Sequence, residues 1–287
     1  MIINKLSPQG FCNGVKRAID IAIKSVNDSN VKKPIYMLGA LIHNSHVTKK
    51  LEDLGIKIID EKNKTRLELL DFIPNNNGSV LVSAHGASLA VFNKIKEKNL
   101  ECIDATCGCV SLIHKKVLEH IKNDDLVLYV GTKGHPECEG VLGLSDEIKL
   151  ITSPFDIDNI NINKRIYATN QTTLSKYEVE AIYNKIRKMY PNSIIEDSIC
   201  NATTERQSAV LNADIADLCI VVGDTRSANT NKLKDIAASR GMKTLLVSDL
   251  NELKPLLPNN INSVIVTSGA SCPDEITNEI IEYLKTK

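Results

Sequence analysis

Short apolar runs alternate with longer stretches of mixed apolar and polar residues along the whole chain. The short runs predict buried strands, and the stretches with apolar residues three or four positions apart predict helices. Regular alternation of strand and helix is typical of parallel α/β units. The predicted strands form three sets, at 34–38, 56–59, 79–83 and 100–103, at 126–130, 149–152, 165–168 and 193–195, and at 218–222, 243–247 and 263–267.

The third set is one strand short, and the segment 1–6 at the start of the chain can supply it. We therefore predict an α/β fold of three similar lobes, each with a roughly four-stranded parallel sheet. Equivalent lobes of this kind would be arranged with pseudo-threefold symmetry around a common centre. We expect the lobes at 13–105, 106–198 and 199–287, with the strand in 1–12 completing the third lobe.

Glycines that end a predicted strand recur at equal spacing, and a polar residue follows each of them four positions later. The glycines are Gly39, Gly131 and Gly223, and the polar residues are His43, His135 and Ser227. Glycine ends strands in many α/β proteins, so a single match would mean little. The equal spacing and the shared offset together favour a true internal repeat.

Three cysteines also occupy equivalent positions in the repeat. Cys12, Cys107 and Cys200 each follow a strand-like segment and open a helix-like one. A helix N-terminus lowers the pKa of a thiol, which favours metal binding. If the lobes fold alike, three thiolates meet at the centre and leave a fourth coordination position open, which suits an iron–sulfur cluster. A catalytic zinc site with three ligands and a water is an alternative, as are buried structural cysteines. Cys102 is expected in the core, and Cys109 is expected to point away from the site.

Polar side chains gather just after the predicted strands, where ligands bind in parallel α/β sheets. They comprise imidazoles, hydroxyls, amides and one carboxylate, which together suit a small and highly charged anion. Neither a phosphate-binding Gly-x-x-x-x-Gly-Lys-Ser/Thr loop nor a Gly-x-Gly-x-x-Gly fingerprint is present. Electrons for a redox step would therefore come from outside. The polar side chains lie in the segments His43-Asn44, Ser83-Ala84-His85-Gly86, Gly134-His135-Pro136-Glu137, Thr169-Asn170-Gln171-Thr172-Thr173, Ser227-Ala228-Asn229 and Thr267-Ser268-Gly269-Ala270-Ser271.

Composition excludes several classes of function. Lys plus Arg and Asp plus Glu number 35 each, so a basic nucleic-acid footprint is absent, and Trp is missing. No apolar stretch approaches the roughly 18–20 residues that cross a bilayer, and we expect no membrane partner. The chain opens without a signal-peptide pattern, and its eight cysteines suggest ligands or reactive thiols. The expected compartment is a reducing cytoplasm.

These motifs, taken together, resemble those of the 4-hydroxy-3-methylbut-2-enyl diphosphate reductases, the last enzymes of the non-mevalonate isoprenoid route. The match runs in the family's order over nearly the whole chain. The matching segments include Gly10-Phe11-Cys12-Asn13-Gly14, Ile42-His43-Asn44, Ser83-Ala84-His85-Gly86, Asp104-Ala105-Thr106-Cys107, Gly134-His135-Pro136-Glu137, Asn170-Gln171-Thr172-Thr173, Asp197-Ser198-Ile199-Cys200, Ser227-Ala228-Asn229 and Ser268-Gly269-Ala270-Ser271.

The resemblance implies reductive dehydroxylation of an allylic diphosphate by two electrons and two protons, giving isopentenyl and dimethylallyl diphosphate. It implies a central [4Fe–4S] cluster on Cys12, Cys107 and Cys200, whose open iron binds the substrate hydroxyl. Glu137 would deliver protons and Thr172 would orient the hydroxyl. The diphosphate would be held by His43, His85, His135, Ser227, Ala228, Asn229 and Ser271. Ferredoxin or flavodoxin would supply electrons, and we expect a monomer or weak dimer.

Two positions depart from the pattern of the family. Gly108-Cys109 stands where Pro-Leu often follows the second cysteine, which loosens the turn but leaves the ligand in place. Ala228 stands where many members have a second serine, so one hydroxyl is missing from the phosphate pocket. Two other classes of function remain open at this stage. One is a hydratase-type cluster enzyme without net electron transfer, and the other is a non-catalytic iron–sulfur or zinc sensor.

Overall fold

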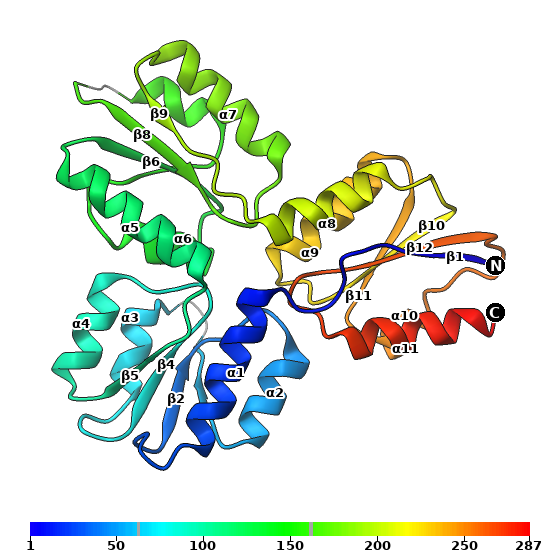
Figure 1. Cartoon of the computed structure of the whole chain (residues 1–287), viewed down its shortest axis with the longest axis horizontal. Helices are drawn as coiled ribbons and strands as arrows, with labels where there is room; N and C mark the ends of the chain where they lie inside the picture. The colour runs from blue at the N-terminus through cyan, green and yellow to red at the C-terminus, as the bar shows by residue number, and fades with distance from the viewer. Residues whose placement is uncertain (62–63, 161–162) are drawn as a thin grey trace.

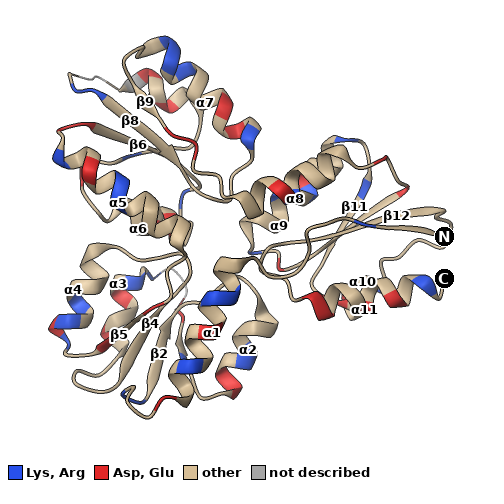
Figure 2. Cartoon of the chain, viewed as in Figure 1, with Lys and Arg blue, Asp and Glu red and all other residues tan. Residues whose placement is uncertain are grey.

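The computed structural model describes residues 1–61, 64–160 and 163–287, which form three lobes around a common centre (Figure 1). Each lobe contains a four-stranded parallel sheet with helices on both faces. The described part of the chain contains no helix with the length and apolar character needed to span a membrane. Positive and negative side chains are spread over the helices of all three lobes (Figure 2).

The first lobe has the strand order β3-β2-β4-β5. Its β2 alternates between two hydrophobic clusters: Ile35 and Met37 pack with α1, and Tyr36 packs on the other side with α4. This alternation follows from the two-residue period of a strand. The elements are α1 (Asn13–Asn27), β2 (Ile35–Leu38), α2 (Ser45–Asp53), β3 (Lys57–Ile59), α3 (Arg66–Leu69), η1 (Leu70–Phe72), β4 (Ser79–Val82), α4 (Leu89–Glu97) and β5 (Glu101–Asp104).

The second lobe repeats this plan with the strand order β7-β6-β8-β9. Val127 and Tyr129 of β6 pack with α5, while Leu128 and Val130 pack in the cluster that contains α7. The elements are α5 (Gly108–Lys122), β6 (Leu126–Val130), α6 (Pro136–Leu142), β7 (Lys149–Ile151), η2 (Pro154–Asn159), β8 (Ile166–Asn170), α7 (Lys176–Met189) and β9 (Ile194–Ile195).

The third lobe is built from both ends of the chain, with the strand order β1-β12-β10-β11. The N-terminal strand pairs in parallel with β12, Ile2 opposite Ser263. The elements are β1 (Ile2–Lys5), α8 (Asn201–Asn212), β10 (Leu218–Val222), α9 (Ala228–Ser239), β11 (Lys243–Val247), α10 (Leu250–Leu253), β12 (Ser263–Ser268) and α11 (Asp274–Lys285). The prediction of three α/β lobes with four-stranded parallel sheets, one closed by the start of the chain, is confirmed.

Two details of the sequence interpretation were wrong. Strand β8 continues to Asn170, two residues beyond the predicted end, because polar Thr169 and Asn170 pair with β6 and are fully buried. Cys102 is exposed rather than in the core. It lies on the edge strand β5, where alternation directs Ile103 toward the hydrophobic cluster and Cys102 toward solvent.

Candidate active site

Three cysteines occupy equivalent places at the centre of the molecule. Cys12, Cys107 and Cys200 are the N-cap residues of α1, α5 and α8, as the sequence predicts. The backbone N–H of each donates to a carbonyl in the loop that follows an equivalent central strand, β12, β4 or β8. The acceptors are Ala270 at 3.1 Å for Cys12, Ala84 at 3.0 Å for Cys107 and Thr172 at 3.1 Å for Cys200. The pseudo-threefold relation therefore extends to the hydrogen bonds that position the thiols.

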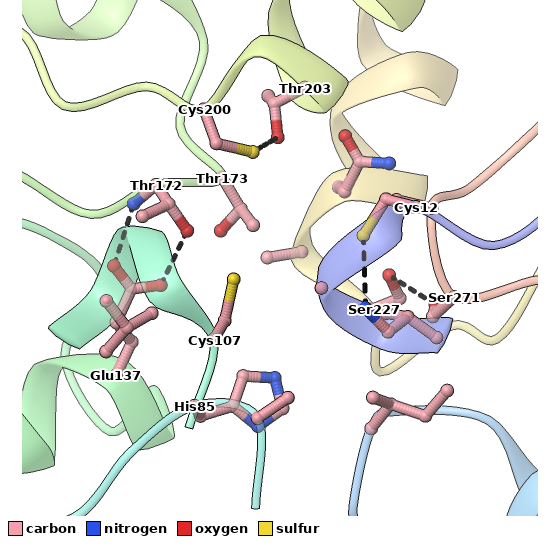
Figure 3. A pocket seen from close by; sticks show the side chains of 18 of the residues that line it. Cys12, His85, Cys107, Glu137, Thr172, Thr173, Cys200, Thr203, Ser227 and Ser271 are labelled. Atoms are coloured by element: carbon pink, nitrogen blue, oxygen red, sulfur yellow. Dashed lines mark hydrogen bonds between the residues drawn. The ribbon is translucent and has the colours of Figure 1, made fainter. Parts of the chain in front are cut away.

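The three thiols converge on one space (Figure 3). Gly14 lies among them: a methyl group there would come within 2.6 Å of Cys107 Sγ and 3.9 Å of Cys12 Sγ. Glycine is needed at this position because a side chain would fill the space that the sulfurs face. An all-thiol donor set from three separate segments fits an iron–sulfur cluster, and it leaves one corner of such a cluster without a protein ligand.

Two arginines connect the cysteine segments of different lobes. Arg17 of α1 donates to the Thr106 carbonyl at 2.9 Å, next to Cys107. Arg206 of α8 donates to the Gly10 carbonyl at 2.7 Å, two residues before Cys12. Burial lowers the pKa of Arg206, whereas the adjoining thiols of Cys12 and Cys200 act in the opposite direction. A cation in this position favours negative charge on the sulfurs.

Hydrogen bonds from the first helical turns also reach the sulfurs. Cys12 Sγ accepts from the Val15 N–H at 3.5 Å, and Cys200 Sγ lies 3.3 Å from the Thr203 hydroxyl. Burial nevertheless raises the pKa of the Cys200 thiol. A metal that binds the thiolate directly would offset this burial cost.

Three histidines form a second cluster in the same cavity. The ring centroids of His43, His85 and His135 are 4.9 to 6.0 Å apart. Burial lowers the pKa of all three, for His135 to about 3, so the rings are neutral near pH 7 when no anion is bound. His135 Nδ1 accepts the Glu137 N–H at 3.1 Å, which places the ring proton on Nε2. The neutral ring therefore keeps one free N–H donor.

The positive charge of a buried arginine determines whether a cation or an anion is favoured beside the three histidines. Three imidazole nitrogens within 4.8 Å of one another could in principle hold a metal ion. The guanidinium of Arg66, however, donates to the Gly86 carbonyl and lowers the pKa of all three rings. Arg66 is 7% exposed, so little solvent screens its charge. A cation beside three donors favours an anion.

The carboxylate of Glu137 is 1% exposed and accepts three hydrogen bonds. Oε1 accepts from the Thr172 N–H at 2.8 Å, and Oε2 accepts from the Thr172 hydroxyl at 2.9 Å (Figure 3). Oε1 also accepts from the Tyr129 hydroxyl at 3.1 Å. Burial raises the pKa of Glu137, and these hydrogen bonds only partly oppose that effect. The result is a buried acid with a raised pKa, linked to a hydroxyl that lines the cavity.

Polar groups of the third lobe complete the lining. Ser227 caps α9, and its hydroxyl lies 3.3 Å from that of Ser271. Asn229 is 4% exposed, yet neither polar atom of its side chain has a partner among the described residues. Buried amides are normally hydrogen-bonded, so Asn229 is suited to receive a ligand. Ala228 lies between these residues and contributes no hydroxyl, as expected from the sequence.

All twelve residues singled out in the sequence line this single cavity. Sequence reasoning assigned no role to Arg66, Tyr129 or Thr203. Arg66 and Tyr129 match no motif on their own. It was wrong about Cys109, which was expected to point away but lines the cavity with the other three thiols. The error came from treating Cys107 as helical, whereas it is the N-cap and has an extended backbone. Cys109 lies in the first turn of α5, directly beside the centre.

This chain is similar to one family of proteins both in sequence and in structure. Residues 3–285 match the family model described as LytB protein. Curated 4-hydroxy-3-methylbut-2-enyl diphosphate reductases from Exiguobacterium sibiricum and Bacillus subtilis are both 40% identical to this chain. Each alignment covers 99% of this chain, and 91% and 90% of the respective relative. The solved E-1-hydroxy-2-methyl-but-2-enyl-4-diphosphate reductase from Plasmodium falciparum superposes with a TM-score of 0.90. It is 32% identical and covers 99% of this chain and 88% of its own.

Proposed function

The chain belongs to the LytB protein family, and on that premise we propose that it reduces 4-hydroxy-3-methylbut-2-enyl diphosphate to isopentenyl and dimethylallyl diphosphate. This is the terminal reaction of the non-mevalonate isoprenoid pathway. It removes one hydroxyl as water and consumes two electrons and two protons. The convergence of three thiols, three imidazoles and one buried carboxylic acid in a single cavity carries the proposal.

The family is one of oxidoreductases whose class implies an iron–sulfur cofactor. The proposed ligands of a [4Fe–4S] cluster are Cys12, Cys107 and Cys200, with the fourth iron free of protein ligands. When bound, such a cluster supplies single electrons and a Lewis-acidic iron beside the reacting carbon–oxygen bond. The protein positions the thiols by the helix N-termini and the three equivalent backbone hydrogen bonds.

The diphosphate is assigned to the end of the cavity that contains the histidines. His43, His85, His135 and Asn229 offer side-chain donors, and the buried Arg66 supplies positive charge nearby. Ser227 and Ser271 add hydroxyls, and Ala228 offers the backbone N–H of the first turn of α9. A highly charged anion at a helix N-terminus is favoured by the helix dipole.

The reacting hydroxyl is assigned to Thr172 and Glu137. Thr172 lines the cavity and donates its hydroxyl proton to Glu137, so it can accept a hydrogen bond from the substrate hydroxyl and orient it. Glu137 holds its proton above the usual pH range of a carboxylic acid because of burial. When Glu137 is protonated, this hydrogen bond reverses: the acid donates to Thr172 Oγ1, and Thr172 passes its own hydroxyl proton to the departing hydroxide, which leaves as water.

Electrons come from an external protein of the ferredoxin or flavodoxin class, because the sequence has no nucleotide-cofactor motif. All eight cysteines are free, which fits a reducing compartment such as the cytoplasm. We assign the active unit to a single chain, as monomer or weak dimer, because one chain supplies every residue named above.

The test is the electron stoichiometry of anaerobic, cluster-loaded protein given the allylic diphosphate and a measured amount of reduced donor. The proposal requires about two electrons consumed per C5 product released. A hydratase-type enzyme would convert the substrate without any reductant, and a sensor would bind it without conversion. Either result would refute the reductase assignment.

Loss of one histidine donor should weaken binding of pyrophosphate, the anionic part of the substrate. We expect His85→Ala to raise the pyrophosphate Kd roughly 10- to 100-fold, because one hydrogen bond to a charged group contributes about 1.5–3 kcal/mol. His85 Nδ1 has no partner among the described side chains, so its removal leaves no protein group unpaired. The measurement is isothermal titration calorimetry, with the exposed-surface variant His46→Ala as control. An unchanged Kd in His85→Ala would remove this residue from the anion site.

The depressed pKa of His135 predicts a loss of stability in acid. The unfolded imidazole binds a proton near pH 6.5 but the folded one only near 3, so stability is lost as the pH falls through this window. Between pH 7 and pH 5 we expect a loss of about 2 kcal/mol from this residue. His135→Asn keeps an N-cap oxygen and should show a flatter dependence in urea unfolding. The raised pKa of Glu137 makes stability change with pH in the opposite direction. Glu137 is present in both the parent and the His135→Asn variant, so its contribution cancels in the comparison. Identical pH slopes would contradict the neutral state of His135.

A further inference from the structure

Cys109 is a fourth thiol beside the three proposed ligands. It lines the cavity described above and also a second cavity that shares Cys12, Cys107 and Cys200 with the first. In this second cavity, α5 contributes Cys109, Leu112, Ile113 and Lys116, which lie one above another on one face of the helix. Cys109 is exposed, so small oxidants in solution can reach its sulfur.

Cys107 and Cys109 are placed for mutual reaction. The distance between their Cα atoms depends on the backbone of the single residue between them, Gly108, which is the first residue of α5. A helical residue holds its two neighbours with Cα atoms about 5.4 Å apart, and disulfide-linked Cα atoms are most often about 5.5–6 Å apart. Both residues line the same two cavities. No other pair of the four thiols is so close in the chain.

Gly108 gives the pair the backbone freedom that a short disulfide loop requires. A methyl group at Gly108 would meet no atom within 4 Å, so no steric contact requires glycine here. Its φ lies outside the left-handed region, so no backbone conformation requires glycine either. What glycine adds is the ease with which φ and ψ can adjust when Cys107 and Cys109 are linked.

We propose that Cys107 and Cys109 form a reversible disulfide when the cluster is lost under oxidising conditions, with a peroxide as oxidant. The Cys109 sulfur attacks one peroxide oxygen, the O–O bond breaks, and a sulfenic acid and one water result. The Cys107 sulfur then attacks the Cys109 sulfur, the S–O bond breaks, and a second water leaves. Two thiols are oxidised, and one hydrogen peroxide is reduced to two waters.

The consequence is protection of a ligand that this protein would otherwise lose. A sulfur that has advanced to sulfinic or sulfonic acid is not restored by thiols, whereas a disulfide is. In protein that carries the cluster, Cys107 would be bound to iron and could not react. This dependence on the cluster rests on the proposed function, in which Cys107 is a ligand. The disulfide itself requires only the two thiols.

The test uses mass spectrometry on full-length protein treated with hydrogen peroxide, with and without the cluster. Trypsin releases the segment 99–115, which contains Cys102, Cys107 and Cys109, so Cys102→Ser is used as background and leaves only the proposed pair in it. In cluster-free protein we expect this peptide to lose about 2 Da and to resist alkylation until it is reduced. In cluster-loaded protein the same peptide should stay reduced.

Cys109→Ser in the same background is the matched variant. Its Cys107 lacks the neighbouring thiol and should gain about 32 or 48 Da as sulfinic or sulfonic acid. After dithiothreitol, iron and sulfide are added, it should recover less cluster absorbance than its parent.

Alkylation of both cysteines in peroxide-treated parent protein, or a cross-link from Cys107 to Cys12 or Cys200, would overturn the inference. If cluster-loaded and cluster-free protein form the disulfide to the same extent, the disulfide does not depend on loss of the cluster, and that part of the inference is overturned. Failure to bind a cluster at all would refute the proposed function and leave the disulfide result intact.

Discussion

Glu137→Gln should lower kcat by about 10²–10⁴-fold, the usual contribution of a positioned general acid, and leave the Kd for substrate close to that of the parent. The substitution keeps the shape of the side chain but removes the proton that we assign to the departing hydroxide. Its carbonyl oxygen can still accept the Thr172 N–H that Glu137 accepts at 2.8 Å. A neutral amide also avoids the cost of burying a charge, so thermal stability should not fall.

The measurement separates the chemical step from binding. Single-turnover rates with reduced protein should fall, while substrate titration under non-turnover conditions should give an unchanged Kd. Glu119→Gln, an exposed glutamate on α5 in the same lobe, serves as the control and should keep the parental rate. A Glu137→Gln protein that turns over at nearly the parental rate would exclude Glu137 as the proton donor.

Cys200→Ser should abolish stable cluster binding. Serine has nearly the same shape but ionises far less readily than a thiol, and iron–sulfur clusters are held by thiolates. Cys200 is more informative than Cys107 because α8 contains no second cysteine that could replace it. For Cys107, by contrast, Cys109 is two residues away.

The readouts for Cys200→Ser are iron content and visible absorbance after anaerobic reconstitution. We expect both to fall close to the level of buffer-treated protein, with far-ultraviolet circular dichroism unchanged. Cys102→Ser, at an exposed cysteine on β5, should bind as much iron as the parent. A Cys200→Ser protein with an unaltered spectrum would contradict the ligand set.

The fold could be predicted largely from the sequence because the central strands of its sheets are buried on both faces. Such strands appear as continuous apolar runs, for example 218–222, whose five residues are all buried. The missing strand of the third lobe could be found because the other two sets had four members each. The end of β8 was harder, since Thr169 and Asn170 are polar but remain in the sheet.

The site residues could be predicted where they recur at equivalent positions or in recognisable motifs. His43, His135 and Ser227 share one offset from a strand-ending glycine, and the three cysteines share the N-cap position. Arg66 could not be found in this way. It lies in a short helix of the first lobe, and only the folded chain brings its guanidinium to Gly86 and the histidines.

Tyr129 and Cys109 are two further residues whose place in the site could not be predicted from the sequence. Tyr129 lies within an apolar strand run and looks like a core residue, yet its hydroxyl reaches Glu137 across the lobe at 3.1 Å. Cys109 follows a proposed ligand by two residues, a spacing that points side chains apart when both residues are helical, but Cys107 is an N-cap with an extended backbone. In both cases the outcome depends on the direction of one side chain, which neither composition nor periodicity contains.

The proposed cluster is held by three cysteines, with one iron left open to the substrate. Mössbauer spectroscopy of protein reconstituted anaerobically with ⁵⁷Fe, together with iron and sulfide analysis, tests this proposal most directly. We predict about four irons and four sulfides per chain, and a change in the signal of one iron when the allylic diphosphate is added. Zinc in place of iron would contradict the proposed iron–sulfur cluster, and a four-iron spectrum that the substrate leaves unchanged would contradict an iron open to the substrate.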